Sequence, residues 1–258
     1  MQRRDFLTAA GATAVLSAAT PIMAQELSMR EFIELRTYTV KGRAKRDILV
    51  ETLEKAFIPA VNALGIKPVG VLLPLESETK FADNVFVVIP HKSFDSFQNL
   101  TPNLLKDETF LKSAFFKTNS KDPVYTNCES ALLRCFEKCP KLELPNLGVD
   151  RFYQIRTYRS FSIERNAAKI DMFNNGGEMA LFRELGLNPI FFGEALTGKS
   201  LPNLTYMVGC ESQEVHDKTW KDFIAHPKWQ TIKGNPAYAD TATEITRVLL
   251  QPSAGSQI

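Results

Sequence analysis

The sequence predicts an α+β fold in which two βαββαβ repeats pack together as an α+β barrel, and two recurrences support this prediction. The segment Phe32–Tyr38 (FIELRTY) recurs in nearly the same form as Phe152–Tyr158 (FYQIRTY). The segment Leu64–Pro68 (LGIKP) likewise recurs as Leu185–Pro189 (LGLNP). Because two copies of one supersecondary unit usually bury their apolar faces against each other, we expect the repeats to share a core.

These recurrences divide the chain into four parts. We expect a signal peptide over residues 1–24, a first repeat over 25–136, a linker over 137–150 and a second repeat over 151–258. The linker is assigned from Pro140, Pro145 and Gly148, which discourage regular structure.

The signal peptide is predicted from a pair of arginines ahead of a short apolar stretch. Arg3 and Arg4 precede an alanine-rich run from Ala9 to Ala19, and small residues allow cleavage after Ala24. This is the pattern of the bacterial twin-arginine route, and the run is too short to span a bilayer comfortably. We expect a periplasmic or secreted protein; the alternative is a leader that stays attached as an anchor.

The charge balance excludes two kinds of partner. The chain has 31 basic and 29 acidic residues, a formal net charge of +2, and the two signs are interspersed along both repeats. A nucleic-acid-binding protein normally carries a basic patch, and a membrane-surface helix carries a lysine-rich face. We expect neither partner, and no membrane span in the mature chain.

The first repeat begins with an alternating strand over 31–40 and continues with a helix. The apolar side chains of the helix recur on one stripe, at Leu49, Leu53, Ala56, Ala60 and Leu64. Gly65 is suited to the position just after a helix, and Pro68 prevents the helix from resuming.

Two strands, a second helix and a closing strand complete this repeat. We predict strands over 69–75 and 85–90, a helix with Ser93 as its N-cap, and a strand over 124–136. The second repeat is predicted to have the same order, with strands near 152–160, 190–196, 203–210 and 242–250 and helices near 163–185 and 213–224.

This order of elements is the ferredoxin-like plan, in which helices cover one face of the sheet. Two such units can pack their bare faces together, which leaves a central space between the sheets. Alternation divides the first strand of each repeat into two rows. We expect one row to face the helices, namely Ile33, Leu35, Thr37, Tyr153, Ile155 and Thr157. We expect the other row to face the space between the sheets, namely Phe32, Glu34, Arg36, Tyr38, Phe152, Gln154, Arg156 and Tyr158.

The sequence resembles the NIPSNAP-like family. The resemblance rests on the strand Glu34–Tyr38, on the Gly-x-x-Pro turns at Gly65 and Gly186, and on the late segment His226–Trp229. It implies the dimeric α+β barrel fold, with an activity that is unsettled in the family. This chain departs from the family pattern, because Asp107–Phe110 replaces the tryptophan element in the first repeat and His226 stands where an acid is usual.

The candidate ligand-binding residues are the polar members of the inward row. Arg36 and Arg156 offer rigid forks of donors that suit a carboxylate or phosphate, and Tyr38 and Tyr158 offer hydroxyls and aromatic walls. Glu34 and Gln154 share this row, so a small anionic or aromatic ligand is expected between the sheets. The alternative is that Glu34 and other carboxylates neutralise the arginines as part of the core.

The late segment supplies two more candidate residues. His226 is suited to act as a general base or a haem ligand if it lines the cavity, and otherwise it lies at the surface before a helix. Trp229, with Trp220, forms either a stacking wall or a plug between helix and sheet. Histidine is scarce, with three in the chain, so no metal centre is expected.

The cysteines predict neither a disulfide scaffold nor a catalytic thiol. The chain has four, Cys128, Cys135, Cys139 and Cys210. Cys128 and Cys135 are seven positions apart on one predicted strand. Because successive residues of a strand face opposite sides, an odd offset points their side chains to opposite faces. Buried free thiols are expected at least as much as a bridge, and no known catalytic motif appears.

Two functional hypotheses follow. The first is an exported, non-catalytic module that binds a small ligand or assembles, including as a homo-oligomer. The alternative is a small α+β-barrel oxidoreductase, monooxygenase-like or haem-peroxidase-like, acting on a small organic substrate in the inter-sheet cavity. The sequence identifies no catalytic residue and no cofactor.

Overall fold

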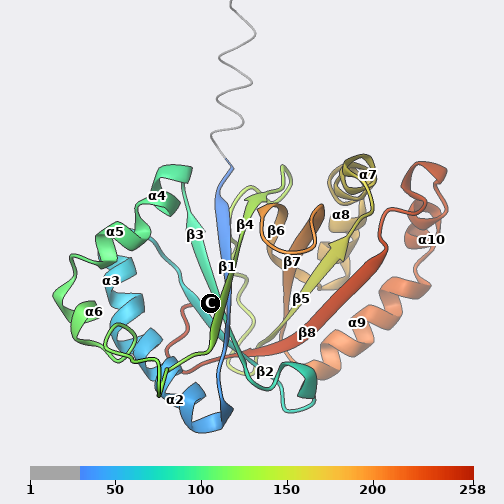
Figure 1. The fold of residues 1–258 in the computed structure, drawn as a ribbon. Coiled ribbons are helices and arrows are strands. Elements are labelled where there is room, and N and C mark those ends of the chain that lie inside the picture. Colours follow the sequence, from blue (N-terminus) through green and yellow to red (C-terminus); the bar gives the residue numbers. More distant parts are fainter. Residues whose placement is uncertain (1–29) are drawn as a thin grey trace, which may run out of the picture.

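The computed structural model describes residues 30–258, so the expected signal peptide lies outside the described residues. Eight strands close into one antiparallel barrel in the order β1-β3-β2-β8-β5-β7-β6-β4 (Figure 1). The first four strands are β1 (Phe32–Thr39), β2 (Gly70–Pro74), β3 (Asn84–His91) and β4 (Asn127–Cys135). The other four are β5 (Phe152–Arg159), β6 (Asn188–Thr197), β7 (Asn203–Cys210) and β8 (Glu244–Pro252).

The two halves of the barrel have the same strand order. The first half reads β4-β1-β3-β2 and the second reads β8-β5-β7-β6, which is the ferredoxin-like arrangement in each case. Pairing of β2 with β8 and of β4 with β6 joins the halves and closes the barrel. The predicted fold class is therefore confirmed.

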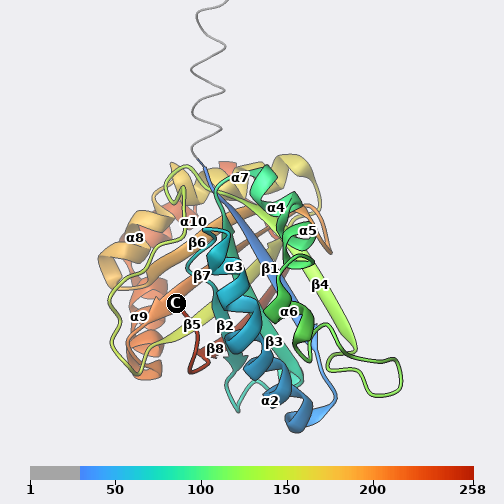
Figure 2. The ribbon, with the colours of Figure 1, turned by 90° about the vertical axis from the view of Figure 1, so that its left-hand side faces the viewer.

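Helices cover the outside of both halves. Over the first half lie α2 (Gly42–Thr52), the π-helix η1 (Leu53–Phe57), α3 (Ile58–Ala63), α4 (Phe94–Gln98), α5 (Leu100–Leu104) and α6 (Glu108–Lys112). Over the second half lie α7 (Ile163–Asn174), α8 (Glu178–Leu185), α9 (Gln213–Ala225) and α10 (Pro227–Lys233). Short 3₁₀ turns occur at Thr79–Phe81 (η2) and Pro236–Tyr238 (η3). Figure 2 shows α2, α3 and α6 in front of the first-half strands.

Local sequence accounts for where the helices begin and end. The hydroxyls of Ser93, Ser162 and Ser212 accept hydrogen bonds from backbone N–H groups three residues later, at 3.1 to 3.2 Å. Gly65 follows α3 with φ +77°, as its predicted position requires. The single helix predicted over 163–185 is instead two helices, because Gly177, at φ 92°, interrupts it.

The barrel interior is apolar, and this overturns the predicted assignment of the two faces. Side chains from strands of both halves meet there, including Ile33, Leu72, Phe86, Val88, Leu133, Tyr153, Ile155, Met207, Val248 and Leu250. The interior of an eight-stranded barrel is just wide enough to be filled by side chains, so aliphatic groups occupy it. The row predicted to face the helices thus faces inward, and the row with Arg36 and Arg156 faces the helices.

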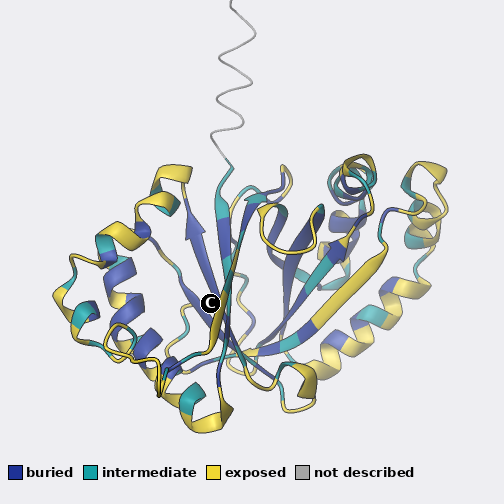
Figure 3. Cartoon of the chain, in the orientation of Figure 1, coloured by how far each residue is buried: buried dark blue, intermediate teal, exposed yellow. Residues whose placement is uncertain are grey.

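Two further apolar layers pack between the barrel and the helices. In the first half, Tyr38 joins Leu49, Leu53 and Phe57 from the covering helices. In the second half, Tyr158 and Tyr206 join Phe173, Phe182 and Phe223. Figure 3 shows buried residues along most of the strands and the inner sides of the helices, with exposed residues on the outer sides and in the first part of β8. None of the helices within residues 30–258 has the length and hydropathy needed to cross a membrane.

The inward position of Ile155 gives a first prediction. Ile155 is 4% exposed and packs in the barrel interior. Replacement by alanine should leave a cavity and lower the free energy of unfolding by about 2 to 5 kcal/mol. Urea denaturation measures the loss. Val149→Ala is the control, because Val149 is 89% exposed and its truncation should change stability by less than about 0.5 kcal/mol. Equal effects of the two substitutions would contradict the inward assignment of Ile155.

Candidate functional site

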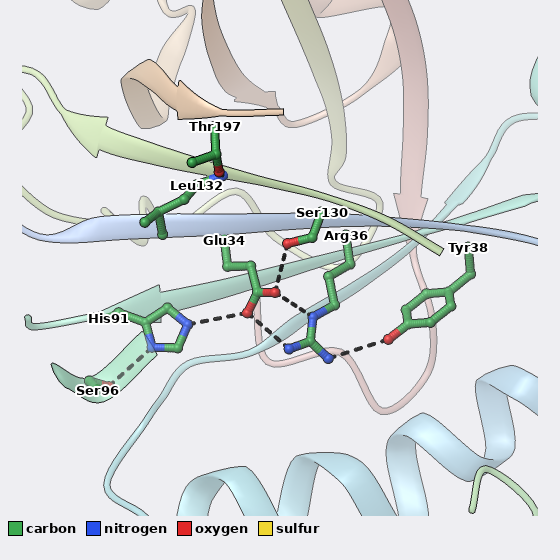
Figure 4. A network of polar contacts seen from close by, with 8 residues as sticks. All are labelled: Glu34, Arg36, Tyr38, His91, Ser96, Ser130, Leu132 and Thr197. Atoms are coloured by element: carbon green, nitrogen blue, oxygen red, sulfur yellow. Dashed lines mark hydrogen bonds and ion pairs between the residues drawn. The ribbon is translucent and has the colours of Figure 1, made fainter. Parts of the chain in front are cut away.

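In the first half, the polar row of β1 forms a closed network beneath the helices (Figure 4). Arg36 donates to both carboxylate oxygens of Glu34, from Nε at 2.6 Å and from Nη2 at 3.0 Å. Its Nη1 lies 3.4 Å from the hydroxyl of Tyr38. This is the bidentate geometry in which a guanidinium and a carboxylate pair most strongly.

Glu34 is the centre of this network. Ser130 Oγ donates to Glu34 Oε1 at 2.8 Å, and His91 Nε2 lies 3.4 Å from Oε2. His91 is itself fixed by a contact of 3.0 Å between Nδ1 and Ser96 Oγ. Burial alone would raise the pKa of Glu34, but the bonds from His91, Arg36 and Ser130 and the charge of Arg36 outweigh it and lower the pKa to about 2. The carboxylate therefore stays ionised and neutralises Arg36.

In the second half, the corresponding arginine has no such partner. Gln154 stands where β1 has Glu34, and Arg156 forms no ion pair with any side chain of residues 30–258. The guanidinium instead stacks on aromatic rings, with Cζ 4.4 Å from the centre of Trp220 and 5.4 Å from that of Tyr158. The position across the sheet also differs, because Arg36 pairs with Ser130 whereas Arg156 pairs with Arg247.

Arg156 lines a cavity of about 680 Å³ between the second-half strands and their covering helices. Strand β5 contributes Gln154, Arg156 and Tyr158, and β8 contributes Arg247. Helices α7 to α10 contribute the opposite wall, which includes Lys169, Glu178, His216, Trp220, Phe223 and Trp229. The volume falls in the range of small-molecule sites.

Four buried polar atoms that belong to side chains lining this cavity have no hydrogen-bond partner within the described residues. They are Gln154 Oε1, Arg156 Nε, His216 Nε2 and Trp220 Nε1. Gln154 is only 4% exposed and His216 only 5% exposed. Buried polar groups in native proteins are nearly always hydrogen-bonded, so a cluster of four around one cavity indicates missing partners.

His216 is held in a defined protonation state. Its Nδ1 lies 2.8 Å from Asp217 Oδ1, and a carboxylate only accepts, so Nδ1 carries the hydrogen and Nε2 keeps a lone pair. Burial lowers the pKa of His216, although the bond to Asp217 opposes this effect. The ring is therefore neutral at pH 7, and its Nε2 is a buried acceptor that has no hydrogen-bond partner among residues 30–258.

The other charges of the buried wall are already paired. Lys169 Nζ donates to Glu178 Oε2 at 2.8 Å, and both side chains are almost fully buried. Burial raises the pKa of Glu178, against the opposing charge of Lys169. The ammonium also lies over the rings of Phe173 and Tyr158, at 4.6 and 5.2 Å from their centres. This pair therefore neutralises Lys169 and leaves the charge of Arg156 without an ion-pair partner within residues 30–258.

The space predicted between the sheets also exists, as a cavity of about 540 Å³ at one mouth of the barrel. It is lined by the inward row, including Leu35, Thr37, Ile155 and Thr157. Thr157 is paired with Thr205 at 2.9 Å. None of the unpartnered buried atoms in residues 30–258 belongs to a residue of this lining. The second-half cavity is therefore the stronger candidate site.

The predicted residues separate into three groups. Gln154, Arg156, Tyr158 and Trp229 come together around the second-half cavity. Glu34, Arg36 and Tyr38 form the first-half network, as the alternative interpretation of the sequence expected. His226 is the N-cap of α10, where its Nδ1 accepts from the N–H of Lys228 at 3.2 Å, and it is not among the residues that line the cavity.

The helix residues of the cavity were not among those predicted from the sequence. His216, Lys169 and Glu178 line it, and Trp220 covers Arg156 rather than only plugging the core. One signal was present in the sequence, because His216 and Trp220 are four residues apart and so share a helix face. Among residues 30–258, no three His, Cys, Asp or Glu side chains are grouped so that they could hold a metal ion.

Comparison with known proteins shows the fold. No protein-family model matches the chain, and the comparison with curated proteins found no match. A candidate monooxygenase from Fusobacterium nucleatum subsp. nucleatum superposes with a TM-score of 0.57 at 12% identity, and the match covers 86% of this chain and 92% of that protein. An anthrone oxidase-like protein superposes with a TM-score of 0.52 at 12% identity, and the match covers 87% of this chain and 92% of that protein. The neighbours that match along most of the chain thus include proteins named for oxidation chemistry.

The NIPSNAP resemblance has a narrower counterpart among solved structures. A NIPSNAP family protein from Agrobacterium tumefaciens str. C58 is 17% identical and is covered over 98% of its length, but it matches only 42% of this chain, with a TM-score of 0.38. The likeness is limited to part of the chain and does not show membership of that family.

The Glu34 network gives a prediction about pH. The folded-state pKa of about 2 lies below that of an unfolded glutamate, so the ionised Glu34 stabilises the protein above about pH 4.5. This contribution, about 3 kcal/mol by linkage, should be lost as the pH falls from about 4.5 to 2. Urea denaturation across this range should show a stability gap between wild type and Glu34→Gln that narrows as the pH falls. A gap that is constant with pH, like that of the exposed control Glu108→Gln, would contradict the network.

Proposed function

We propose that this protein binds a small planar organic molecule in the second-half cavity, between β5 and helices α7 to α10. The observation that carries the proposal is the cluster of unpartnered buried atoms on Gln154, Arg156, His216 and Trp220. A buried polar group without a partner costs about 1 to 3 kcal/mol. A ligand that supplies the missing partners recovers this free energy.

The walls of the cavity favour a flat ligand. Trp220, Phe223, Trp229 and Tyr158 line it, and Trp229 lies against Phe223 with ring centres 4.6 Å apart. Aromatic side chains contribute large apolar areas and prefer offset or edge contacts with other rings. The cavity therefore combines stacking surfaces with a few directed polar groups, as small-molecule sites do.

Tryptophan fluorescence tests this proposal, because the two tryptophans of the chain, Trp220 and Trp229, both line the cavity. Two azo dyes that absorb tryptophan emission serve as probes: 4-hydroxyazobenzene, which is neutral, and 2-(4-hydroxyphenylazo)benzoate, which adds a carboxylate. At least one of them should quench the emission with a saturable, one-to-one isotherm. Absence of saturable quenching by both dyes would overturn the proposal.

Two size-increasing variants locate the bound dye. Ala242→Leu narrows the second-half cavity and should weaken binding, whereas Thr246→Leu narrows the cavity at the barrel mouth and should leave it unchanged. The reverse pattern would assign the ligand to the inter-sheet space and contradict the proposed site.

A second candidate function, oxidation of the bound molecule, is favoured by His216. The neutral ring has a free Nε2 in the cavity wall and a carboxylate on its other nitrogen, which is the arrangement of a general base. In an oxygenation without a cofactor, Nε2 would take a proton from an activated CH₂ group. The carbanion would reduce O₂, with one oxygen atom entering the substrate as a carbonyl and the other leaving as water.

His216 also fits a haem group. Histidines that bind a metal through one ring nitrogen usually donate a hydrogen bond from the other to a carboxylate, as His216 does to Asp217. Bound haem would supply one-electron and oxygen chemistry. His226, which the sequence suggested for this role, is committed to the helix cap.

Titration with hemin, followed by ultraviolet–visible absorption, tests the haem form of this second candidate. If His216 ligates iron, the Soret band should shift with a one-to-one end point. His216→Ala should abolish the shift, and His226→Ala should retain it. A spectrum equal to that of free hemin would contradict the haem form and leave oxygen uptake as the test of the cofactor-free form.

A further inference from the structure

We infer that the ligand of the second-half cavity is a carboxylate, whose carboxylate group pairs with Arg156 as that of Glu34 pairs with Arg36. This inference rests on the proposed function and names the ligand class. It comes from comparing the two halves of the same chain, in which one arginine is neutralised from within and the other is not.

The two arginines occupy equivalent positions. Each is the fifth residue of the first strand of its half, β1 or β5. Each strand is flanked by the last and the third strand of its half, since the order is β4-β1-β3 in one and β8-β5-β7 in the other. Glu34 and Gln154 precede the arginines by two residues, so both project from the same face as the arginines. A difference in chemistry at these two positions is therefore a difference between equivalent sites.

The exchange of Glu34 for Gln154 removes the internal counter-ion. In the first half, both oxygens of Glu34 accept from Arg36, and the carboxylate fills the guanidinium edge that contains Nε. A glutamine carries no charge to replace it, and Arg156 Nε and Gln154 Oε1 are both left unpartnered within the described chain. Arg156 is half-buried, and its buried Nε has neither a counter-ion nor another partner within residues 30–258, so the site is suited to accept an external anion.

The surrounding charges strengthen the attraction for an anion. The lining of the cavity includes five basic and three acidic side chains. Among the acids, Glu178 is bonded to Lys169 and Asp217 to His216. Arg247 replaces Ser130 beside the arginine and forms no ion pair with another part of residues 30–258. The cavity lining therefore has an excess of positive charge, to which Arg156 on β5 and Arg247 on β8 contribute.

The geometry selects a carboxylate with a planar body. Trp220 covers one face of the Arg156 guanidinium, at 4.4 Å, so an anion approaches its edge, where two parallel N–H groups match two carboxylate oxygens. Trp220 Nε1 is a further donor, and a hydroxyl on the ligand can donate to one of two acceptors, Gln154 Oε1 or His216 Nε2. A hydroxyaryl carboxylate therefore supplies acceptors for Arg156 and Trp220 and a donor for one of these two atoms.

The experiment compares the two azo dyes, which differ by the carboxylate, on matched variants by isothermal titration calorimetry. The wild type should bind 2-(4-hydroxyphenylazo)benzoate at least about 30-fold more tightly than 4-hydroxyazobenzene, the ratio that corresponds to the lower limit for a buried charge pair. Gln154→Glu supplies the internal carboxylate. This variant should lose the preference for the carboxylate dye and should still bind the neutral dye. Arg159→Gln, which removes a positive charge from the same strand outside the cavity lining, should keep the preference.

The outcomes separate this inference from the proposed function. Binding of neither dye overturns the proposed function, whereas equal binding of both dyes overturns only the carboxylate assignment. Should Gln154→Glu fail to fold, as judged by circular dichroism, Arg156→Gln gives the same test, and Arg156→Lys should retain part of the preference. A preference that survives Arg156→Gln would show that the carboxylate is not held by Arg156.

Discussion

Backbone hydrogen bonds between β2 and β8 and between β4 and β6 close two four-stranded sheets into one barrel, and that closure decides which strand residues face the helices. A closed barrel of eight strands leaves room inside for little more than its own side chains. Aliphatic residues such as Ile33 and Ile155 fill much of it. The alternate residues of β1 and β5, among them Arg36 and Arg156, lie under the helices. The protein therefore has two helix-covered polar sites, one in each half.

The two sites have opposite character because of one residue. Glu34 neutralises Arg36 and makes the first site a buried ion pair that stabilises the fold. Gln154 leaves Arg156 without a counter-ion and beside a cavity with aromatic walls. A fold built from two similar halves can in this way keep one half for stability while the other half accepts a ligand.

The sequence was sufficient for the fold but not for the site. The repeated strand, the Ser93 N-cap and the glycine after α3 are local signals, and each was found where it was predicted. Alternation, however, only sorts residues into two rows, and it does not say which row faces inward. That choice depends on closure of the barrel, which is a property of the whole chain.

His216 and Lys169 were missed because their place in the cavity depends on how α7 and α9 pack over the sheet. The exchange of Glu34 for Gln154 was visible in the sequence, and it became meaningful only with the partners of each arginine in view.

The most direct measurement of the central claim is nuclear magnetic resonance of the arginine Nε–H groups during titration with 2-(4-hydroxyphenylazo)benzoate. Our account predicts that the Arg156 signal shifts and becomes protected from exchange with water as the dye binds, while the Arg36 signal is protected from the start and does not move. If both signals respond alike, or if the Arg156 signal is unchanged at saturation, the two halves do not differ in the way described, and the account is wrong.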